Sequence, residues 1–196
     1  MKALYVMDFL EVCDELIKPI AEHSENVAKA SIKIYDNLSS VHKMEVFDFK
    51  AKDFSFEQIV VLCGLYHDIG KTYVDNFYPH MLDKEKFTPE DKQRIKQHTL
   101  MGAELIQSIH EQYPFDDIVC AYIEQTCLFH HEKINGSGYL KLKTIPRIAQ
   151  IVTVADVYSA GIEKRPYEGE KRLERLQEEM YSMSINQTYV EALFRE

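Results

Sequence analysis

The sequence predicts an all-α protein, folded as one compact helical bundle of about seven to eight helices. Apolar residues recur at helical spacing through most of the chain, and no alternating pattern typical of a strand persists beyond a few residues. A chain of 196 residues buries about 70% of the surface that it exposes when unfolded, which supports one sizeable core and leaves little for a second. We therefore expect residues 1–196 to form a single domain.

The first half of the chain predicts two helices separated by a loop. Residues 20–38 carry apolar side chains at helical spacing, with His23 in the first turns. Residues 39–53 lack this pattern and are expected to form a loop. The hydroxyl of Ser55 can then cap a second helix, and Gly70 is expected to stop it in the left-handed conformation that glycine favours.

The middle of the chain predicts two further helices and a turn. Thr88, followed by a proline and two carboxylates, is typical of a helix start, so we expect His98 to lie inside that helix. Another helix is expected to run over 116–131. The glycines in 135–138 predict a turn after it.

Three helices are expected in the last third of the chain. Pro146 opens the first, which carries Asp156. Residues 170–180 form a charged helix with a solvated face, and residues 189–194 form a short one whose apolar side packs on the core.

Composition and charge narrow the class of protein. Hydrophobic residues make up 45% and charged residues 28% of the chain, which is typical of a soluble globular protein. Asp8 and Glu11 interrupt the apolar run near the N-terminus, so we expect no signal peptide, no membrane segment and a cytoplasmic protein. The net charge of -9 argues against a nucleic-acid polymer as partner, but it leaves a small anionic substrate open.

The cysteines indicate structural rather than chemical roles. The four of them, at positions 13, 63, 120 and 127, show no CxxC spacing. Buried reduced thiols are therefore expected, rather than disulfides or a zinc site.

The adjacent pair His67-Asp68 is the first chemical feature of the chain. Neighbouring residues on a helix point about 100° apart, so the two side chains cannot share one apolar stripe, and one must face something polar. At a helix end, His67 could bind one metal ion while the two oxygens of Asp68 bridge a pair. The alternative is that Asp68 caps local backbone and His67 is a hydrogen-bonded core histidine.

His130-His131 and Asp156 raise similar questions. One histidine of the pair could instead be exposed at the helix end, where it would stabilise the helix dipole when protonated. Asp156 follows an apolar stretch, in which an unpaired carboxylate would cost several kcal/mol or become protonated. A cation is therefore expected beside it, either a metal or a basic side chain such as Arg147.

Taken together, these segments resemble a known family. The order of histidines and aspartates is similar to that of the HD-GYP branch of the HD superfamily of metal-dependent phosphohydrolases, and the resemblance runs from about residue 17 to the C-terminus. The strings that carry it are YHDIGK at 66–71, IKQHTLMGAEL at 95–105, HHEKINGSGYL at 130–140 and IPRIAQIVTVADVYSAGIEKRPY at 145–167.

The resemblance implies a helical fold of the HD type with two divalent metal ions. Nitrogen and oxygen ligands without thiolate suit iron or manganese. Pro19 stands where members with three metals carry glutamate, which favours two ions here. The expected ligands are His23, His67, Asp68, His98, His130, His131 and Asp156.

The implied reaction is hydrolysis of a cyclic dinucleotide such as cyclic di-GMP, with a metal-bridging hydroxide as nucleophile. Asp68 and Lys71 are the expected catalytic residues, because Asp68 positions both ions and Lys71 stabilises charge on the phosphate; without the motif, Lys71 would be an ordinary surface lysine. Lys71, Tyr139 and Arg165 are expected to bind the substrate, with Tyr139 stacking on a base.

Four residues depart from the family pattern and predict that cyclic di-GMP is bound weakly or hydrolysed slowly. Asn135 and Leu140 change the glycine-rich turn, Gln150 replaces an arginine, and Glu168 stands where a basic residue is usual. Two alternatives therefore stay open: a catalytically weak module that binds cyclic nucleotides and signals through a partner, and a phosphohydrolase for another nucleotide. The sequence carries no prediction of oligomeric state.

Overall fold

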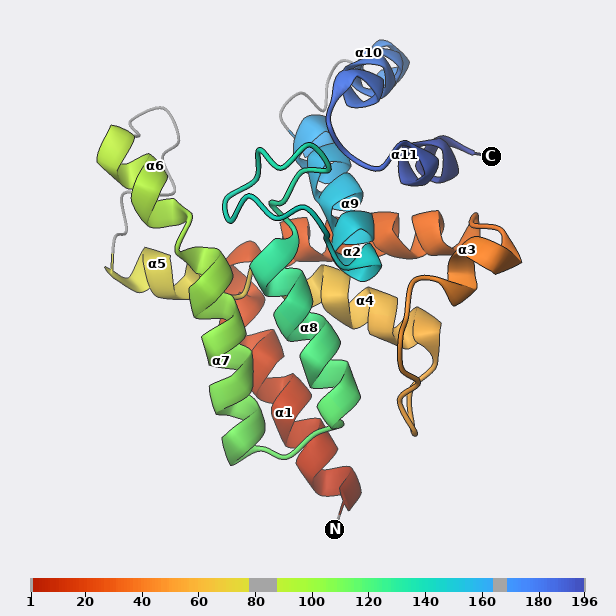
Figure 1. Cartoon of the computed structure of the whole chain (residues 1–196). Helices are drawn as coiled ribbons and strands as arrows, with labels where there is room; N and C mark the ends of the chain where they lie inside the picture. Colours follow the sequence, from red (N-terminus) through yellow and green to blue (C-terminus); the bar gives the residue numbers. More distant parts are fainter. Residues whose placement is uncertain (1, 78–87, 164–168, 196) are drawn as a thin grey trace.

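A computed structural model describes residues 2–77, 88–163 and 169–195, with side chains over 9–74, 88–163 and 172–195. The described residues contain helices and no strands (Figure 1), which confirms the all-α prediction. Eight of the described helices have eight or more residues, in agreement with the expected seven to eight. The elements are α1 (Lys2–Ile17), the single 3-10 turn η1 (Lys18–Ile20), α2 (Ala21–Asp36), α3 (Ser40–Met44), α4 (Phe56–Tyr66), α5 (Lys71–Phe77), α6 (Pro89–Ile95), α7 (His98–Gln112), α8 (Asp117–Phe129), α9 (Arg147–Glu163), α10 (Gly169–Ser182) and α11 (Gln187–Phe194).

The centre of the fold is the packing of α2 against α4 and α9, while α7 and α8 lie side by side next to it (Figure 1). Val27, Ile59 and Val152, one from each of the three central helices, are completely buried. Gly64 permits the close approach of α4 to α2, because a Cβ there would lie 2.7 Å from the Cα of Ala28. This packing brings helix ends from distant parts of the chain together in one place.

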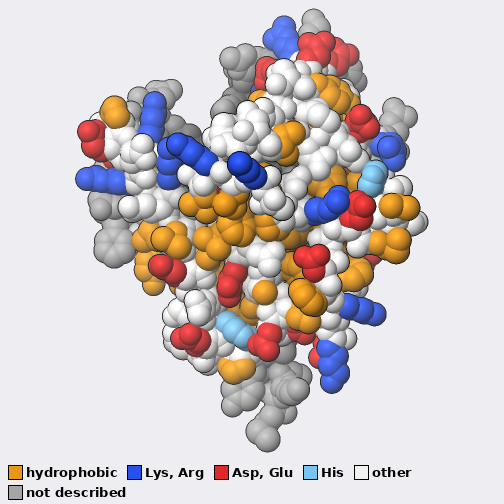
Figure 2. Space-filling model, viewed as in Figure 1, with side chains coloured by type: hydrophobic (Ala, Val, Ile, Leu, Met, Phe, Trp, Pro, Cys, Tyr) orange, Lys and Arg blue, Asp and Glu red, His pale blue; other side chains and the backbone are white. Residues whose placement is uncertain are grey.

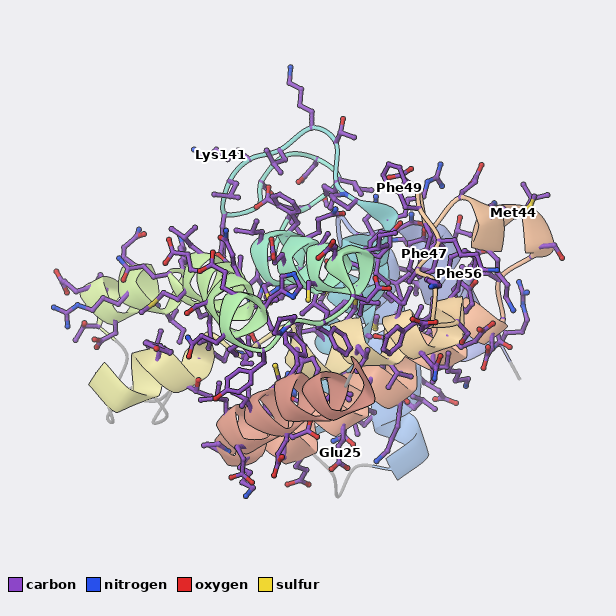
Figure 3. The ribbon with its side chains drawn as sticks, turned by 90° about the horizontal axis from the view of Figure 1, so that it is seen from below. Glu25, Met44, Phe47, Phe49, Phe56 and Lys141 are labelled. Carbon is purple, nitrogen blue, oxygen red and sulfur yellow. The ribbon has the colours of Figure 1, made fainter. Side chains whose placement is uncertain are left out.

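Aromatic side chains close the core at the other end of α4. Phe47 and Phe56 lie next to one another (Figure 3), stacked with ring centroids 4.7 Å apart, and Tyr122 of α8 meets Phe47 edge-on at 5.0 Å. The Tyr122 hydroxyl donates to the carbonyl of Phe49. The segment between α3 and α4 therefore packs against α8 and is hydrogen-bonded to it.

Helix starts follow the predicted capping residues. Ser55 forms a reciprocal capping box with Gln58 at the start of α4, and Thr88 forms one with Asp91 at the start of α6. Asp116 accepts hydrogen bonds from the first turn of α8.

The prediction of buried, reduced cysteines is also confirmed, since all four cysteines are buried and unpaired. None of the described helices combines the length and the apolar character needed to cross a membrane.

Two short-range predictions about helix extent were wrong. Residues 39–53 are not all loop, because the Ser39 hydroxyl accepts from the His42 amide and starts α3. His98 does not lie inside the helix that begins at Thr88; that helix, α6, ends at Ile95, and His98 is the first residue of α7. Helices α1 and α5 were not predicted from the sequence.

The role expected of Gly70 was wrong as well. Among the described residues, only Gly136 and Lys141 have positive φ, so Gly70 does not adopt the left-handed conformation. Glycine is required there because of close packing: a Cβ would lie 2.0 Å from the carbonyl oxygen of His98 and 2.5 Å from the amide nitrogen of Gly102. Gly70 thus brings the His67-Asp68 segment directly against the start of α7.

Candidate metal centre

The seven residues expected to bind metal come together at the converging helix ends. His23 lies in α2 and Asp156 in α9; His67-Asp68 and His130-His131 directly follow α4 and α8, and His98 begins α7. They form two groups, within each of which the potential ligand atoms lie within 4.8 Å of one another. We call Asp68, His98, His130 and His131 the inner group, and His23, His67 and Asp156 the outer group.

Asp68 lies between the two groups. Its Oδ1 is 3.1 Å from Nε2 of His98 and 3.5 Å from Nε2 of His130. Its Oδ2 is 3.2 Å from Nε2 of His67 and 3.8 Å from Nε2 of His23. A single carboxylate therefore directs one oxygen to each group, which is the arrangement required to bridge two ions.

Backbone carbonyls fix the orientation of three imidazoles. Nδ1 of His67 donates to the carbonyl of Gly64 at 2.8 Å, Nδ1 of His130 donates to that of Thr126 at 2.9 Å, and Nδ1 of His98 donates to that of Ile95. A neutral imidazole that donates from Nδ1 keeps its lone pair on Nε2. Three lone pairs are thus aimed at the centre of the cluster, as in metal sites whose ligands are oriented by their outer hydrogen bonds.

The polar atoms at the centre fit a cation. Nε2 of His67 and Oδ1 of Asp68 are buried and have no hydrogen-bond partner. Several lone pairs that face one another without a donor are costly in a buried site, and a divalent ion satisfies them all. His67 is hydrogen-bonded through Nδ1 alone, and its unpaired, buried Nε2 disfavours a purely structural role. The cluster as a whole is suited to divalent metal.

The pKa shifts of His131, His98 and Asp68 agree with the use of the cluster as a ligand set. That of His23 does not, because burial lowers its pKa but Asp156, Asp68 and Glu163 together raise it above its usual value. Burial, followed by the neighbouring His130 and His98, lowers the pKa of His131 well below its usual value. Burial also lowers the pKa of His98. Burial alone raises the pKa of Asp68, but the Lys71 ammonium and His67 hold it well below its usual range. Neutral imidazoles and an ionised carboxylate are the forms that bind metal.

The structure also decides two of the alternatives left by the sequence. Arg147 is not the partner of Asp156, because its guanidinium contacts Glu45 at 2.8 Å. Asp156 Oδ1 instead lies 3.1 Å from Nε2 of His23. His131 is partly buried against Tyr139 and is not the exposed histidine considered for the end of α8.

Sequence reasoning missed Glu163. Its Oε2 lies 3.0 Å from Nδ1 of His23, and its Oε1 accepts from the side-chain amide of Asn26 at 3.0 Å. Its spacing was a usable signal, because a residue seven positions after Asp156 lies on nearly the same face of α9, about two turns further on.

Glu132 was missed as well. This buried carboxylate accepts from the backbone amides of Leu140 at 2.7 Å and Leu142 at 2.8 Å. It holds the loop that carries Tyr139 against the end of α8, with Gly138 so close that a Cβ would lie 2.5 Å from the Cα of Glu132. The signal was a glutamate directly after the histidine pair and before a glycine-rich turn.

The expected substrate-binding residues differ in their placement. The Lys71 ammonium contacts Oδ2 of Asp68, and the ring of Tyr139 lies over His131 with centroids 4.6 Å apart. Arg165 lies outside the described residues, as does Glu168. The amide of Gln150 is occupied by the Ile145 carbonyl and by Asn186, so that side chain braces the start of α9.

Comparisons with known proteins bear on the same region. The family described as HD domain matches residues 20–161, which include all seven residues of the two groups. A cyclic di-GMP phosphodiesterase of Thermotoga maritima is 34% identical over 121 residues, 60% of this chain and 31% of that protein. Cyclic di-GMP phosphodiesterase PA4108 of Pseudomonas aeruginosa is 34% identical over 109 residues, 54% of this chain and 24% of that protein.

Two further proteins extend this likeness. The 3'3'-cGAMP-specific phosphodiesterase 1 of Vibrio cholerae is 29% identical over 120 residues, 60% of this chain and 26% of that protein. The chain therefore spans under a third of the length of these three curated relatives. A solved structure, Bd1817, a HDG"Y"P protein from Bdellovibrio bacteriovorus, matches 89% of this chain and 51% of its own with a TM-score of 0.58 and 23% identity, which shows a shared fold.

Proposed function

The chain belongs to the HD domain family, and we propose that it is a metal-dependent phosphohydrolase that cleaves a phosphodiester bond of a cyclic dinucleotide such as cyclic di-GMP. The observation that carries the proposal is that the two carboxylate oxygens of Asp68 face different groups, Oδ1 the inner group and Oδ2 the outer group. Each group can then contribute one site of a metal pair. The nitrogen and oxygen donors, without thiolate, favour iron or manganese.

The ions would be held by His98, His130 and His131 on one side and by His23, His67 and Asp156 on the other, with Asp68 between them. When bound, a pair of divalent ions supplies Lewis acidity and lowers the pKa of water toward neutrality. The burial of Asp68 and of the surrounding imidazoles excludes bulk water from the ligands and strengthens each electrostatic contact.

Lys71 provides a positive side chain that can act on the reacting phosphate. Its ammonium contacts Asp68. Burial lowers the pKa of Lys71, but the charges of Asp68 and Asp156 and the contact with Asp68 together raise it above its usual value, so Lys71 stays protonated. A fixed ammonium beside the metal pair stabilises the negative charge that develops on the non-bridging oxygens.

Tyr139 is suited to binding a base. The residue is 36% exposed, and its ring lies over His131 at the edge of the cluster, with the Lys96 ammonium 5.2 Å from the ring centroid. A flat, partly exposed ring beside a phosphate site can stack on a nucleobase. The Glu132 carboxylate supports this position by accepting hydrogen bonds from the backbone amides of Leu140 and Leu142, which follow Tyr139 in the same loop.

The net charge of -9 does not exclude an anionic substrate, because basic side chains lie on the elements that adjoin the cluster. Figure 2 shows Lys and Arg side chains over α6 and over the loop between α8 and α9. Lys141 and Lys143 are exposed on that loop, and Lys96 lies at the end of α6. Charges within about 8 Å of a phosphate dominate its attraction at physiological salt.

The proposal is tested by turnover of defined substrates. Protein purified without chelator and loaded anaerobically with Mn²⁺ or Fe²⁺ is incubated with cyclic di-GMP, 3'3'-cGAMP and bis-p-nitrophenyl phosphate, and products are separated by chromatography. We expect hydrolysis of bis-p-nitrophenyl phosphate and of at least one cyclic dinucleotide, with slow turnover of cyclic di-GMP given Glu168. Fully loaded protein that cleaves none of the three would contradict the proposal.

A further inference from the structure

The four hydrogen-bonded histidines of the cluster are not held in the same way. His67, His98 and His130 donate from Nδ1 to backbone carbonyls. His23 instead pairs through Nδ1 with a side-chain carboxylate, that of Glu163, at 3.0 and 3.2 Å. Among these four imidazoles of the described residues, that of His23 is therefore the one whose Nδ1 is paired with a carboxylate.

The pair of His23 and Glu163 is also more accessible to solvent than the other three histidines. The side chains of His67, His98 and His130 are at most 1% exposed, whereas that of His23 is 21% exposed and that of Glu163 is 35% exposed. Glu163 lines a pocket of about 290 Å³ between α2, α9 and α11. Asn26 also lines this pocket and donates to Glu163.

We propose that Glu163 is a positioning residue that sets the affinity of the outer metal site, so that the two ions bind unequally and the outer ion is the exchangeable one. The proposal rests on the proposed function, because it presupposes that the cluster binds two ions. Glu163 acts through His23 and touches neither ion nor substrate.

The physical reason is the charge of the acceptor. A carboxylate that accepts a hydrogen bond from Nδ1 makes Nε2 of the imidazole a stronger metal ligand and fixes the orientation of the ring. Loss of such a partner typically lowers metal affinity by about 10- to 100-fold. The backbone carbonyls that support His98 and His130 of the inner group belong to helices α6 and α8. Changing Glu163 should therefore weaken one site and leave the other unchanged.

Mn²⁺ binding to metal-free protein separates the two sites. Free Mn²⁺ is followed by electron paramagnetic resonance while the wild type, Glu163→Gln and Asn26→Ala are titrated. Glu163→Gln keeps the size of the side chain and removes its charge. Glu191→Gln is the matched control, because Glu191 is an exposed glutamate on the neighbouring α11. The melting temperature of each metal-free protein checks that the fold is retained.

We expect the wild type and Glu191→Gln to bind two ions with distinct affinities. In Glu163→Gln the weaker affinity should fall about 10- to 100-fold while the stronger one is unchanged, and Asn26→Ala should shift it in the same direction by less. Two affinities equal to those of the wild type, or loss of both sites together, would overturn the inference. A wild type that binds no Mn²⁺ would instead contradict the proposed function.

Discussion

Replacing Asp68 by asparagine should lower the hydrolysis of bis-p-nitrophenyl phosphate by about a thousandfold or more, equivalent to at least about 4 kcal/mol of transition-state free energy. The change retains shape but replaces one carboxylate oxygen by an amide group, which cannot bind metal through its nitrogen. Because Oδ1 faces His98 and Oδ2 faces His67, either orientation of the amide removes an oxygen from one of the two groups. The rate and the bound manganese should therefore fall together.

Two controls accompany Asp68→Asn. Asp53→Asn makes the same chemical change at an exposed position before α4, and His110→Ala removes a histidine that pairs with Asp117 away from the cluster. Both should keep the activity of the wild type within a few fold. If Asp68→Asn were as active as these controls in excess Mn²⁺, the bridging role of Asp68 would be wrong.

Lys71→Gln should separate catalysis from metal binding. The variant removes the ammonium that contacts Oδ2 of Asp68, an oxygen that it shares with the outer metal site. We expect kcat to fall about 100- to 1,000-fold, as for the loss of one group that stabilises transition-state charge. Metal affinity should be unchanged or higher, since a competing cation has been removed from Asp68. Steady-state kinetics and elemental analysis of the same preparation measure both quantities.

Lys29→Gln is the matched control for Lys71→Gln. Lys29 is exposed on α2 and contacts only Glu25 in the part of the chain that the structure describes, at 3.5 Å. Its variant should have the kcat of the wild type. A Lys71→Gln enzyme with full metal content and an unchanged kcat would show that Lys71 does not act on the phosphate.

The sequence was sufficient for features that depend on neighbouring residues. Ser55, Thr88 and Asp116 start helices because a side-chain oxygen within three residues satisfies free backbone amides, and such short-range pairs can be read directly. The break between α6 and α7 could not be read in this way. It coincides with the packing of Gly70 against His98 and Gly102, which are distant in sequence.

The same distinction applies to the cluster. Its seven residues could be predicted from residue type and from the resemblance, and the structure brings all of them together. Glu163 was missed because its contact with His23 spans 140 positions, and Glu132 because its partners are loop amides rather than side chains. Helical spacing can place such a residue on the face that carries a ligand, as for Glu163 and Asp156, but its contact with the ligand depends on tertiary packing.

The central claim is that the cluster holds two divalent ions, and metal analysis tests it most directly. The protein is reconstituted anaerobically with Mn²⁺ or Fe²⁺, freed of unbound metal by desalting, and measured by elemental analysis against protein concentration. We expect close to two ions per chain, bound by the inner and outer groups with Asp68 between them. A reconstituted protein without bound metal would contradict the account.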